Sequence, residues 1–251
     1  MINILKADLY RLSKSKSFYF YWLFISLTYL LTILSKSAGG VVIGAPIAAT
    51  NAKLDIEQVT MNFTYYFLSL FLIYGVIVCD FGEKTIKNTI SSGISRKKYY
   101  LSKYFFTEWM VLSSFIAGNV LFYWVNKIVN GGKYSSSFGE FMRAVGLQIC
   151  PFMGICGLLI FVAFLVKRTA AFNALTIMGP MIYFSIAMVI YQIGSERFVE
   201  KYLLKYEFST QLSGVISWSG EYVQICTVLG VVLLITSFAA GYAAFTKLEI
   251  D

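Results

Sequence analysis

The sequence contains no histidine, and only 14% of its 251 residues are charged. Without histidine, the chain cannot form a Ser-His or Cys-His nucleophile pair or an H-E-x-x-H zinc site. The four cysteines form no C-x-x-C motif and lie within or at the edges of apolar runs, at Cys79, Cys150, Cys156 and Cys226. This placement favours small buried side chains over a disulfide framework, which needs cysteines in aqueous loops.

Apolar residues dominate the composition of the chain. Hydrophobic residues make up 58% of the sequence and aromatic residues 18%. The charged fraction of 14% is well below the roughly 25% that soluble globular domains carry. Too little polar surface remains to cover a soluble core of this size. We therefore expect an all-α, multi-pass protein of the cytoplasmic membrane, formed by a single domain over residues 1–251.

Six long stretches lack Asp, Glu, Lys and Arg. A helix crosses the hydrocarbon core with about 20 residues, and each charge at mid-span costs about 3 kcal/mol. The stretches, and hence the predicted transmembrane helices, are Ser17–Ser35, Gln58–Cys79, Trp109–Asn126, Ala144–Val166, Thr169–Ser195 and Tyr222–Thr246, with the third helix beginning near residue 105. A further uncharged run, Ser37–Ala52, contains glycines and a proline and is interpreted as part of an outer loop, 36–57.

Charge sets the predicted orientation. With six spans, both termini share a side with the loops 80–104 and 167–168, and this side carries most of the 21 Lys and Arg residues. The positive-inside rule therefore predicts cytoplasmic termini. Before the first span, apolar residues recur at helical spacing from Ile2 to Leu12 among basic residues. This pattern predicts an amphipathic helix on the inner membrane surface.

The inner loop 80–104 has the pattern of two short helices. Ser92-Gly93 ends the first helix, and Ser95 can cap the second, which continues into the third span. Such a loop is expected to form a small protrusion at the cytoplasmic surface that binds a partner protein. The alternative is a solvated basic loop that only sets the membrane topology. Glu108, at the inner edge of the third span, is a candidate ion-pair partner for Lys103.

This loop resembles the first cytoplasmic loop of type-2 (type V) ABC exporter permeases, bacterial six-span subunits that work with a separate ATPase chain. In that family an acidic residue and a Gly-Thr-like turn follow the second span, then a helix, a Ser-Arg pair and often a Lys on the return into the third span. The matching positions here are Glu83, Thr85, Gly93, Ser95, Arg96, Tyr99 and Lys103, with Lys84 where many members have Gly. The amphipathic start and the six-span layout match more loosely over nearly the whole chain.

The resemblance implies a transport subunit and not an enzyme. Two ATPase subunits hold ATP and Mg²⁺, and a second copy of this chain or a homologous permease completes the transporter. No catalytic residue, cofactor, metal or nucleic acid is expected on this chain. The resemblance assigns the ATPase contact to Phe81, Glu83, Thr85, Lys87, Arg96, Tyr99 and Tyr100, with Lys167 and Arg168 of the second inner loop. The segment Gly131–Ser135 is not a phosphate loop, because Tyr134 stands where that motif needs Ser or Thr.

Aromatic residues and methionines on the second and fifth spans suit apolar or amphipathic cargo. Related exporters line their cavity with these two spans. The candidate cargo path therefore comprises Phe63, Phe67, Phe71, Tyr74, Met178, Met181 and Met188. The alternative is that these side chains only pack between helices or face lipid. By the same resemblance, the outer loop 196–221 forms short re-entrant helices that close the exit; an ordinary amphipathic surface loop is the alternative.

The resemblance favours export of amphipathic antimicrobial or cytolytic peptides, as by phenol-soluble-modulin or lantibiotic-immunity exporters. A drug or lipid exporter is one alternative, and a membrane sensor, scaffold or assembly factor that transports nothing is another. A proton- or ion-coupled carrier is disfavoured, because such carriers keep a buried ionisable relay and the six spans are expected to carry no charge at mid-membrane.

Overall fold

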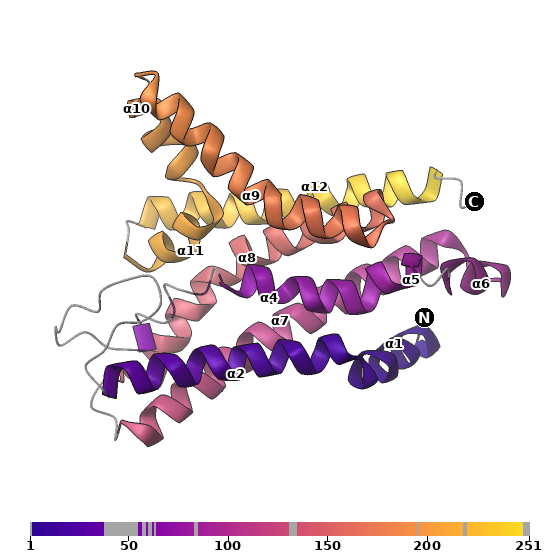
Figure 1. Ribbon diagram of the computed structural model, residues 1–251, viewed down its shortest axis with the longest axis horizontal. Helices are drawn as coiled ribbons and strands as arrows, with labels where there is room; N and C mark the ends of the chain where they lie inside the picture. Colours follow the sequence, from indigo (N-terminus) through magenta and orange to yellow (C-terminus); the bar gives the residue numbers. More distant parts are fainter. Residues whose placement is uncertain are drawn as a thin grey trace.

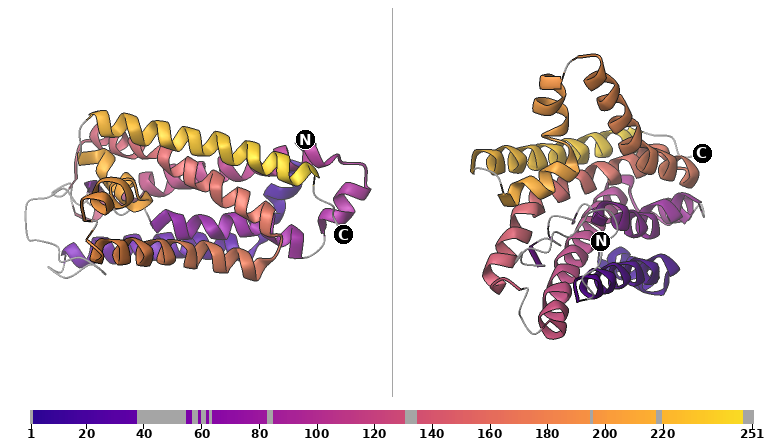
Figure 2. Two further views of the ribbon diagram at one scale, coloured as in Figure 1. Left: turned by 90° about the horizontal axis from the view of Figure 1, so that it is seen from above. Right: turned by 60° about the vertical axis from the view of Figure 1, so that its left-hand side comes forward.

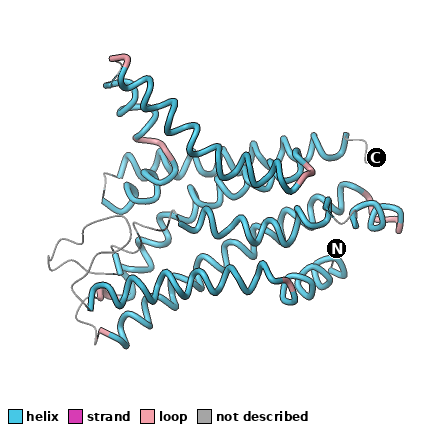
Figure 3. The backbone as a smooth tube through the Cα atoms, in the orientation of Figure 1, coloured by secondary structure: helices cyan, strands magenta, loops and turns pink. Residues whose placement is uncertain are grey.

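The computed structural model describes residues 2–37, 55–56, 59, 62, 64–82, 85–130, 135–194, 196–217 and 220–247. Within these ranges the chain is helical and contains no strand (Figure 3). The helices are α1 (Ile2–Lys14), α2 (Lys16–Ser37), α4 (Thr64–Ile73), the π-helical η1 (Tyr74–Val78), α5 (Cys79–Gly82), α6 (Thr85–Ser91), α7 (Arg96–Val129), α8 (Phe138–Val166), α9 (Thr169–Gln192), α10 (Glu196–Phe198), the π-helical η2 (Val199–Leu204), α11 (Phe208–Ser217) and α12 (Gly220–Lys247). The predicted all-α class is confirmed.

Five segments among the described residues are long and apolar enough to cross a membrane. They are Thr64–Gly82, Arg96–Val129, Phe138–Val166, Thr169–Gln192 and Gly220–Lys247. By length and composition the chain is therefore a multi-pass membrane protein. The first predicted span, Ser17–Ser35, coincides with α2, which is not among these five, so the sixth crossing stays a prediction.

The second and third spans reach further toward the inner loop than the sequence indicates. η1 and α5 continue α4 as far as Gly82. The helix predicted to start after Ser95 and to continue into the third span is confirmed as α7, which runs unbroken from Arg96, so the span segment extends beyond its predicted start near residue 105. Ser95 fixes this start, because its hydroxyl accepts a hydrogen bond from the backbone N–H of Lys98 at 3.4 Å, as an N-cap does. The predicted loop is thereby reduced to α6 and its two short connections.

The long helices run roughly lengthwise, so the molecule has two ends (Figures 1 and 2). One end, here called the α6 end, holds α1, α6, the turn between α8 and α9, and the last turn of α12. The opposite end, the α11 end, holds α10 and α11. The segments that the sequence places on one side of the membrane thus share one end of the molecule.

Aromatic rings fill the contact between α4, α7 and α8. Phe115 of α7 stacks on Phe152 of α8 with ring centroids 4.5 Å apart, and Tyr65 of α4 meets Phe115 edge-on at 4.9 Å. All three side chains are buried. Offset and edge-on ring pairs stabilise a packed contact beyond the burial of their area, so these three helices form the centre of the bundle.

Glycines allow the backbones of α12 and α8 to come into direct contact. A Cβ atom on Gly154 would lie 2.5 Å from the carbonyl oxygen of Gly230, closer than side chains and carbonyls approach in proteins. Small residues serve such close helix contacts in membranes. α9, by contrast, is the least buried of the five span segments; only Phe172, Thr176 and Ala187 are buried on it, and in Figure 1 it diverges from α12 toward α10.

Candidate functional site

Four charged side chains from three helices meet at the α6 end, and together they are called the ion cluster: Asp8 and Arg11 of α1, Asp80 of α5 and Lys103 of α7. Lys103 Nζ lies 2.6 Å from Asp8 Oδ1 and 2.6 Å from Asp80 Oδ2. Arg11 forms a hydrogen-bonded ion pair with Asp80, and its Nη2 lies 3.6 Å from Asp8 Oδ1. The Lys103 side chain is only 2% exposed, so this is a buried ionic contact.

Neutral groups complete the ion cluster. The carbonyl oxygen of Val76, in the π-helical turn η1, accepts hydrogen bonds from Lys103 Nζ at 3.0 Å and from Arg11 Nη2 at 3.1 Å. Asp80 also accepts from the Tyr99 hydroxyl at 2.5 Å and from Thr85 Oγ1 of α6 at 3.0 Å. The cluster therefore connects α1, the end of the second span, α6 and α7 through bonds to one carboxylate and one carbonyl.

The two acids of the ion cluster differ in their surroundings. Asp80 accepts bonds from Arg11, Lys103, Tyr99 and Thr85. Asp8 Oδ2, in contrast, has no hydrogen-bond partner among the described residues. Burial raises the pKa of the Asp8 carboxyl more than the attraction of Lys103 and Arg11 lowers it. Asp80 is thus the better satisfied of the two carboxylates.

Most residues that the resemblance assigns to the ATPase contact lie at the α6 end. Lys87 on α6 and Arg168 in the α8–α9 turn are exposed, whereas Thr85, Arg96 and Lys167 are half-buried. Phe81 is half-buried and meets the ring of Phe164 edge-on, with centroids 6.0 Å apart. The remaining residue of that loop, Glu83, lies outside the described residues.

Tyr99 and Tyr100 occupy a different place from the one assigned by resemblance. Their exposed fractions are 1% and 0%. Tyr99 stacks on Phe245 of α12 at 5.8 Å while donating its hydroxyl proton to Asp80. Tyr100 packs against Phe164 at 4.7 Å and donates to the carbonyl of Phe238 at 3.1 Å. Both rings fasten α7 to α8 and α12, and neither is available to a partner in this conformation.

The ion cluster was missed by the sequence analysis, apart from Lys103. The proposed pairing of Lys103 with Glu108 is wrong, because the Lys103 ammonium forms ion pairs with Asp8 and Asp80 instead. Both carboxylate oxygens of Glu108 are buried and accept no hydrogen bond of good geometry in the part of the chain that is described. A signal was present: Asp8, three residues before Arg11, is an acid on an otherwise basic amphipathic segment.

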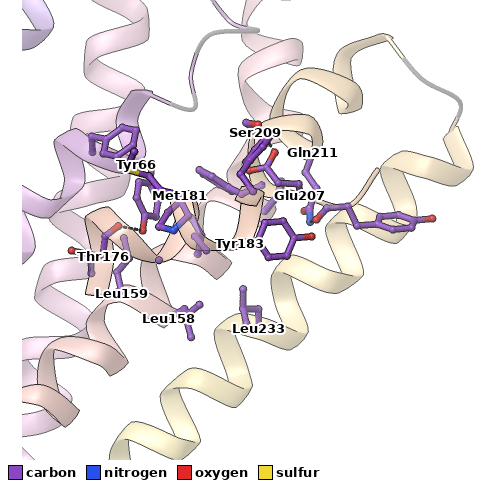
Figure 4. A pocket seen from close by; sticks show the side chains of 18 of the residues that line it. Tyr66, Leu158, Leu159, Thr176, Met181, Tyr183, Glu207, Ser209, Gln211 and Leu233 are labelled. Atoms are coloured by element: carbon purple, nitrogen blue, oxygen red, sulfur yellow. Dashed lines mark hydrogen bonds between the residues drawn. The ribbon is translucent and has the colours of Figure 1, made fainter. Parts of the chain in front are cut away.

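A pocket of about 960 Å³ opens between the spans, toward the α11 end (Figure 4). It is enclosed by α4, α8, α9, α12 and the segment 206–211. Most of its wall is aliphatic or aromatic, and its lower part in Figure 4 is formed by Leu158, Leu159 and Leu233. A concave, largely apolar space of this size is typical of small-ligand sites.

Polar groups gather at one end of the pocket. Glu207, Ser209 and Gln211 lie together above the apolar wall in Figure 4. Glu207 Oε2 accepts a hydrogen bond from the backbone N–H of Thr210 at 3.1 Å and so caps α11. Gln148 of α8 donates to the carbonyl of Leu212 at 2.6 Å, which holds α11 against the bundle. The pocket is therefore amphipathic, with a fixed polar end.

Two of the predicted cargo-path residues line this pocket: Phe67 of α4 and Met181 of α9. Phe71 lies elsewhere, stacked on Phe24 of α2 with centroids 6.0 Å apart. Tyr74 is half-buried in η1, and Met178 and Met188 are exposed on α9; none of these three lines the pocket. Phe63 lies outside the described residues.

The second and fifth spans do meet at the pocket. Tyr66 of α4 donates its hydroxyl proton to the carbonyl of Thr176 of α9 at 2.7 Å (Figure 4). The sequence analysis missed α8 and α12, which form much of the wall. These two helices pack closely at Gly154 and Gly230 and contribute Pro151, Ile155 and Gly230 to the lining.

No family model matches this sequence, and no curated protein matches it either.

Proposed function

We propose that this chain is the membrane-spanning permease subunit of an ATP-driven exporter, with ATP and Mg²⁺ bound by separate ATPase subunits. The observation that carries the proposal is the ion cluster. Through Asp80, it ties the short surface helix α6 directly to the ends of two span segments. A force applied to α6 by a partner would reach α5 and α7 through the Thr85–Asp80 and Asp80–Lys103 contacts.

α6 has the surface that such a contact needs. Lys87, Asn88 and Ser91 are exposed, while Ile86 is buried beneath them and Thr85 is bonded to Asp80. The exposed Arg168 lies at the same end of the molecule. A basic, rigidly attached helix at the cytoplasmic end supports the coupling role that the sequence resemblance implies. Two copies, or this chain with a homologous permease, would complete the transporter.

The pocket is the proposed cargo site. Its apolar wall and polar end suit an amphipathic cargo, and the proposed cargo class is amphipathic peptides. An α-helix with side chains is about 10–12 Å across, so a pocket of this size would hold only a short part of such a peptide. α9, mostly exposed, is the wall best able to move, because few packed side chains restrain it.

α2 supports a sixth crossing and cytoplasmic termini. Its 22 residues correspond to about 33 Å at 1.5 Å per residue, enough for a hydrocarbon core of about 30 Å. Tyr21, Ile25 and Tyr29 are buried against the bundle, whereas leucines such as Leu23 and Leu27 point outward. Outward-facing leucines on a helix whose only charges, Lys16 and Lys36, lie at its two ends are stable in lipid and unfavourable in water.

The test is whether an ATPase subunit is encoded beside this chain and co-purifies with it. Wild type is compared with Lys87→Glu and Arg168→Glu at the α6 end, and with Arg143→Glu, an exposed arginine near the start of α8. The first two variants should lose most of the bound ATPase and its stimulated hydrolysis, and Arg143→Glu should lose neither. Failure of wild type to bind any ATPase would contradict export and favour a sensor or scaffold.

A further inference from the structure

Glu108 is a buried carboxyl that neither the ion cluster nor the pocket uses. It lies on α7, five residues and thus about 7.5 Å further along the helix than Lys103, at a rise of about 1.5 Å per residue. The residue is 6% exposed. Neither of its carboxylate oxygens accepts a hydrogen bond of good geometry from the described residues. The sequence analysis placed Glu108 at the edge of the span, but the structure encloses it within the bundle.

The groups around Glu108 are neutral. Tyr104 and Tyr100 lie one and two turns before it on α7, and Cys156 of α8 is close enough to interact with it electrostatically. Ser237 of α12 lies beside Tyr104. The Tyr104 hydroxyl donates to the carbonyl of Leu234 at 3.4 Å and also interacts with the Glu108 carboxyl, as a neutral hydroxyl without a compensating charge. Tyr100, Tyr104 and Cys156 interact electrostatically with Glu108, with Ser237 of α12 and Ser69 of α4 one contact further away, and none of these carries a positive charge.

The nearest cation on the same helix cannot compensate Glu108. The Lys103 ammonium is held by Asp8, Asp80 and the carbonyl of Val76. A buried carboxylate without a charge partner is strongly unfavourable even beside one neutral hydroxyl, and such a group becomes neutral by binding a proton. In this packing, Glu108 is therefore expected to be a carboxylic acid.

We propose that Glu108 is a proton-binding site, occupied while α7, α8 and α12 are packed together and emptied when these helices separate and admit water. Glu108 lies where the three helices meet: a Cβ atom on Gly157 of α8 would come within 2.8 Å of the Tyr104 hydroxyl and 2.7 Å of Ser237 Oγ. Opening of this junction is thus linked to release of one proton. The proposal goes beyond export and does not depend on an ATPase partner.

The first test detects the bound proton directly. Dicyclohexylcarbodiimide, an apolar carbodiimide, reacts with protonated carboxyl groups in apolar surroundings. Purified protein in lipid nanodiscs is treated between pH 5 and pH 8, and the labelled peptides are identified by mass spectrometry. Glu108 should be labelled, with a yield that falls as the pH rises, and the exposed Glu140 should not. Absence of label on Glu108 throughout this range would overturn the proposal, even if every Glu108 variant failed to fold.

The second test measures the linkage, with Cys156 as the reporter. Cys156 is fully buried beside Glu108, so its alkylation by N-ethylmaleimide requires the junction to open. The other three cysteines are replaced by alanine, and Glu108→Gln is compared with its Glu108 parent. The ratio of the parent rate to the Gln variant rate cancels the thiol's own pH dependence.

One released proton raises the opening constant up to tenfold per pH unit. The rate ratio should therefore rise severalfold between pH 5 and pH 8. A ratio that stays constant with pH would mean that Glu108 is only a packed polar side chain, and would overturn the proposed linkage.

Discussion

The Lys103 ammonium lies 2.6 Å from the Asp80 carboxylate, and this contact joins the third-span helix α7 to the end of the second span. Asp80 simultaneously holds α6 through Thr85 and α1 through Arg11. A single carboxylate thus connects the surface helix that a partner would contact to two span segments. The following predictions test this connection, the packing behind it, and the pocket.

Asp80→Asn should destabilise the protein much more than Asp8→Asn. Removing the Asp80 charge leaves Lys103 and Arg11 with Asp8 alone, and breaking a buried ion pair in this way costs about 3–5 kcal/mol. Asp8 makes fewer bonds, and its Oδ2 has no partner in the described chain. Thermal unfolding followed by size-exclusion chromatography measures both variants. Equal losses, or a larger loss for Asp8→Asn, would contradict the ranking.

Asp8 should also give stability a distinct pH dependence. Because burial raises its pKa above the ordinary value of 3.8, the folded protein binds the Asp8 proton more tightly than the unfolded chain. Its contribution is fully present below pH 3.8 and is lost as the pH rises through the raised pKa. The melting temperature of Asp8→Asn relative to wild type should therefore increase from acid toward neutral pH. A constant difference across that range would be inconsistent with this assignment.

Gly154→Ala should loosen the packing of α12 on α8. The added methyl would meet the backbone of Gly230 at 2.5 Å, and backbone cannot move aside as a side chain can. Overpacking of this kind costs about 1–3 kcal/mol. Gly146→Ala is the control, because a Cβ at Gly146 meets nothing within 4 Å. A lowered melting temperature is expected for Gly154→Ala only; a wild-type value would show that the contact is not close.

Gly179→Leu should block the pocket without disturbing the fold. Gly179 lines the pocket on α9, and a Cβ there meets nothing within 4 Å, so the new side chain enters open space. Cargo-stimulated ATP hydrolysis in reconstituted membranes should fall severalfold. Gly146→Leu adds the same side chain at an exposed position away from the pocket and should leave stimulation intact. If both variants are stimulated normally, cargo does not use this pocket.

Local patterns predicted the helices well. The uncharged runs correspond to α2, α4 with η1, α7, α8, α9 and α12, and Ser95 caps α7 as its position suggests. These features depend on residues close together in the chain. The start of the third span segment was placed too late because the predicted span was ended at charged residues, whereas Lys103 and Glu108 are both buried within α7.

Long-range contacts were not predictable in the same way. Asp8 and Lys103 are separated by 95 residues, and no periodicity joins α1 to the middle of the chain. The pocket shows the same limit, since Phe67 and Met181 were named from residue type and the family resemblance, while Leu159 and Leu233, which also line it, were not named. Glu108 was given the wrong ion-pair partner, because the sequence alone does not show that Lys103 pairs with Asp8 and Asp80.

Photo-crosslinking from α6 tests the proposed coupling most directly. A photoreactive p-benzoyl-phenylalanine replaces Lys87, exposed on α6, and in a matched variant replaces Arg143, exposed on α8. Both proteins are irradiated in membranes containing the neighbouring ATPase, with and without ATP. The proposal predicts a covalent adduct between position 87 and the ATPase whose yield changes with ATP, and none from position 143. No adduct from position 87, or equal adducts from both positions, would contradict the assignment of this chain as an ATP-driven permease subunit.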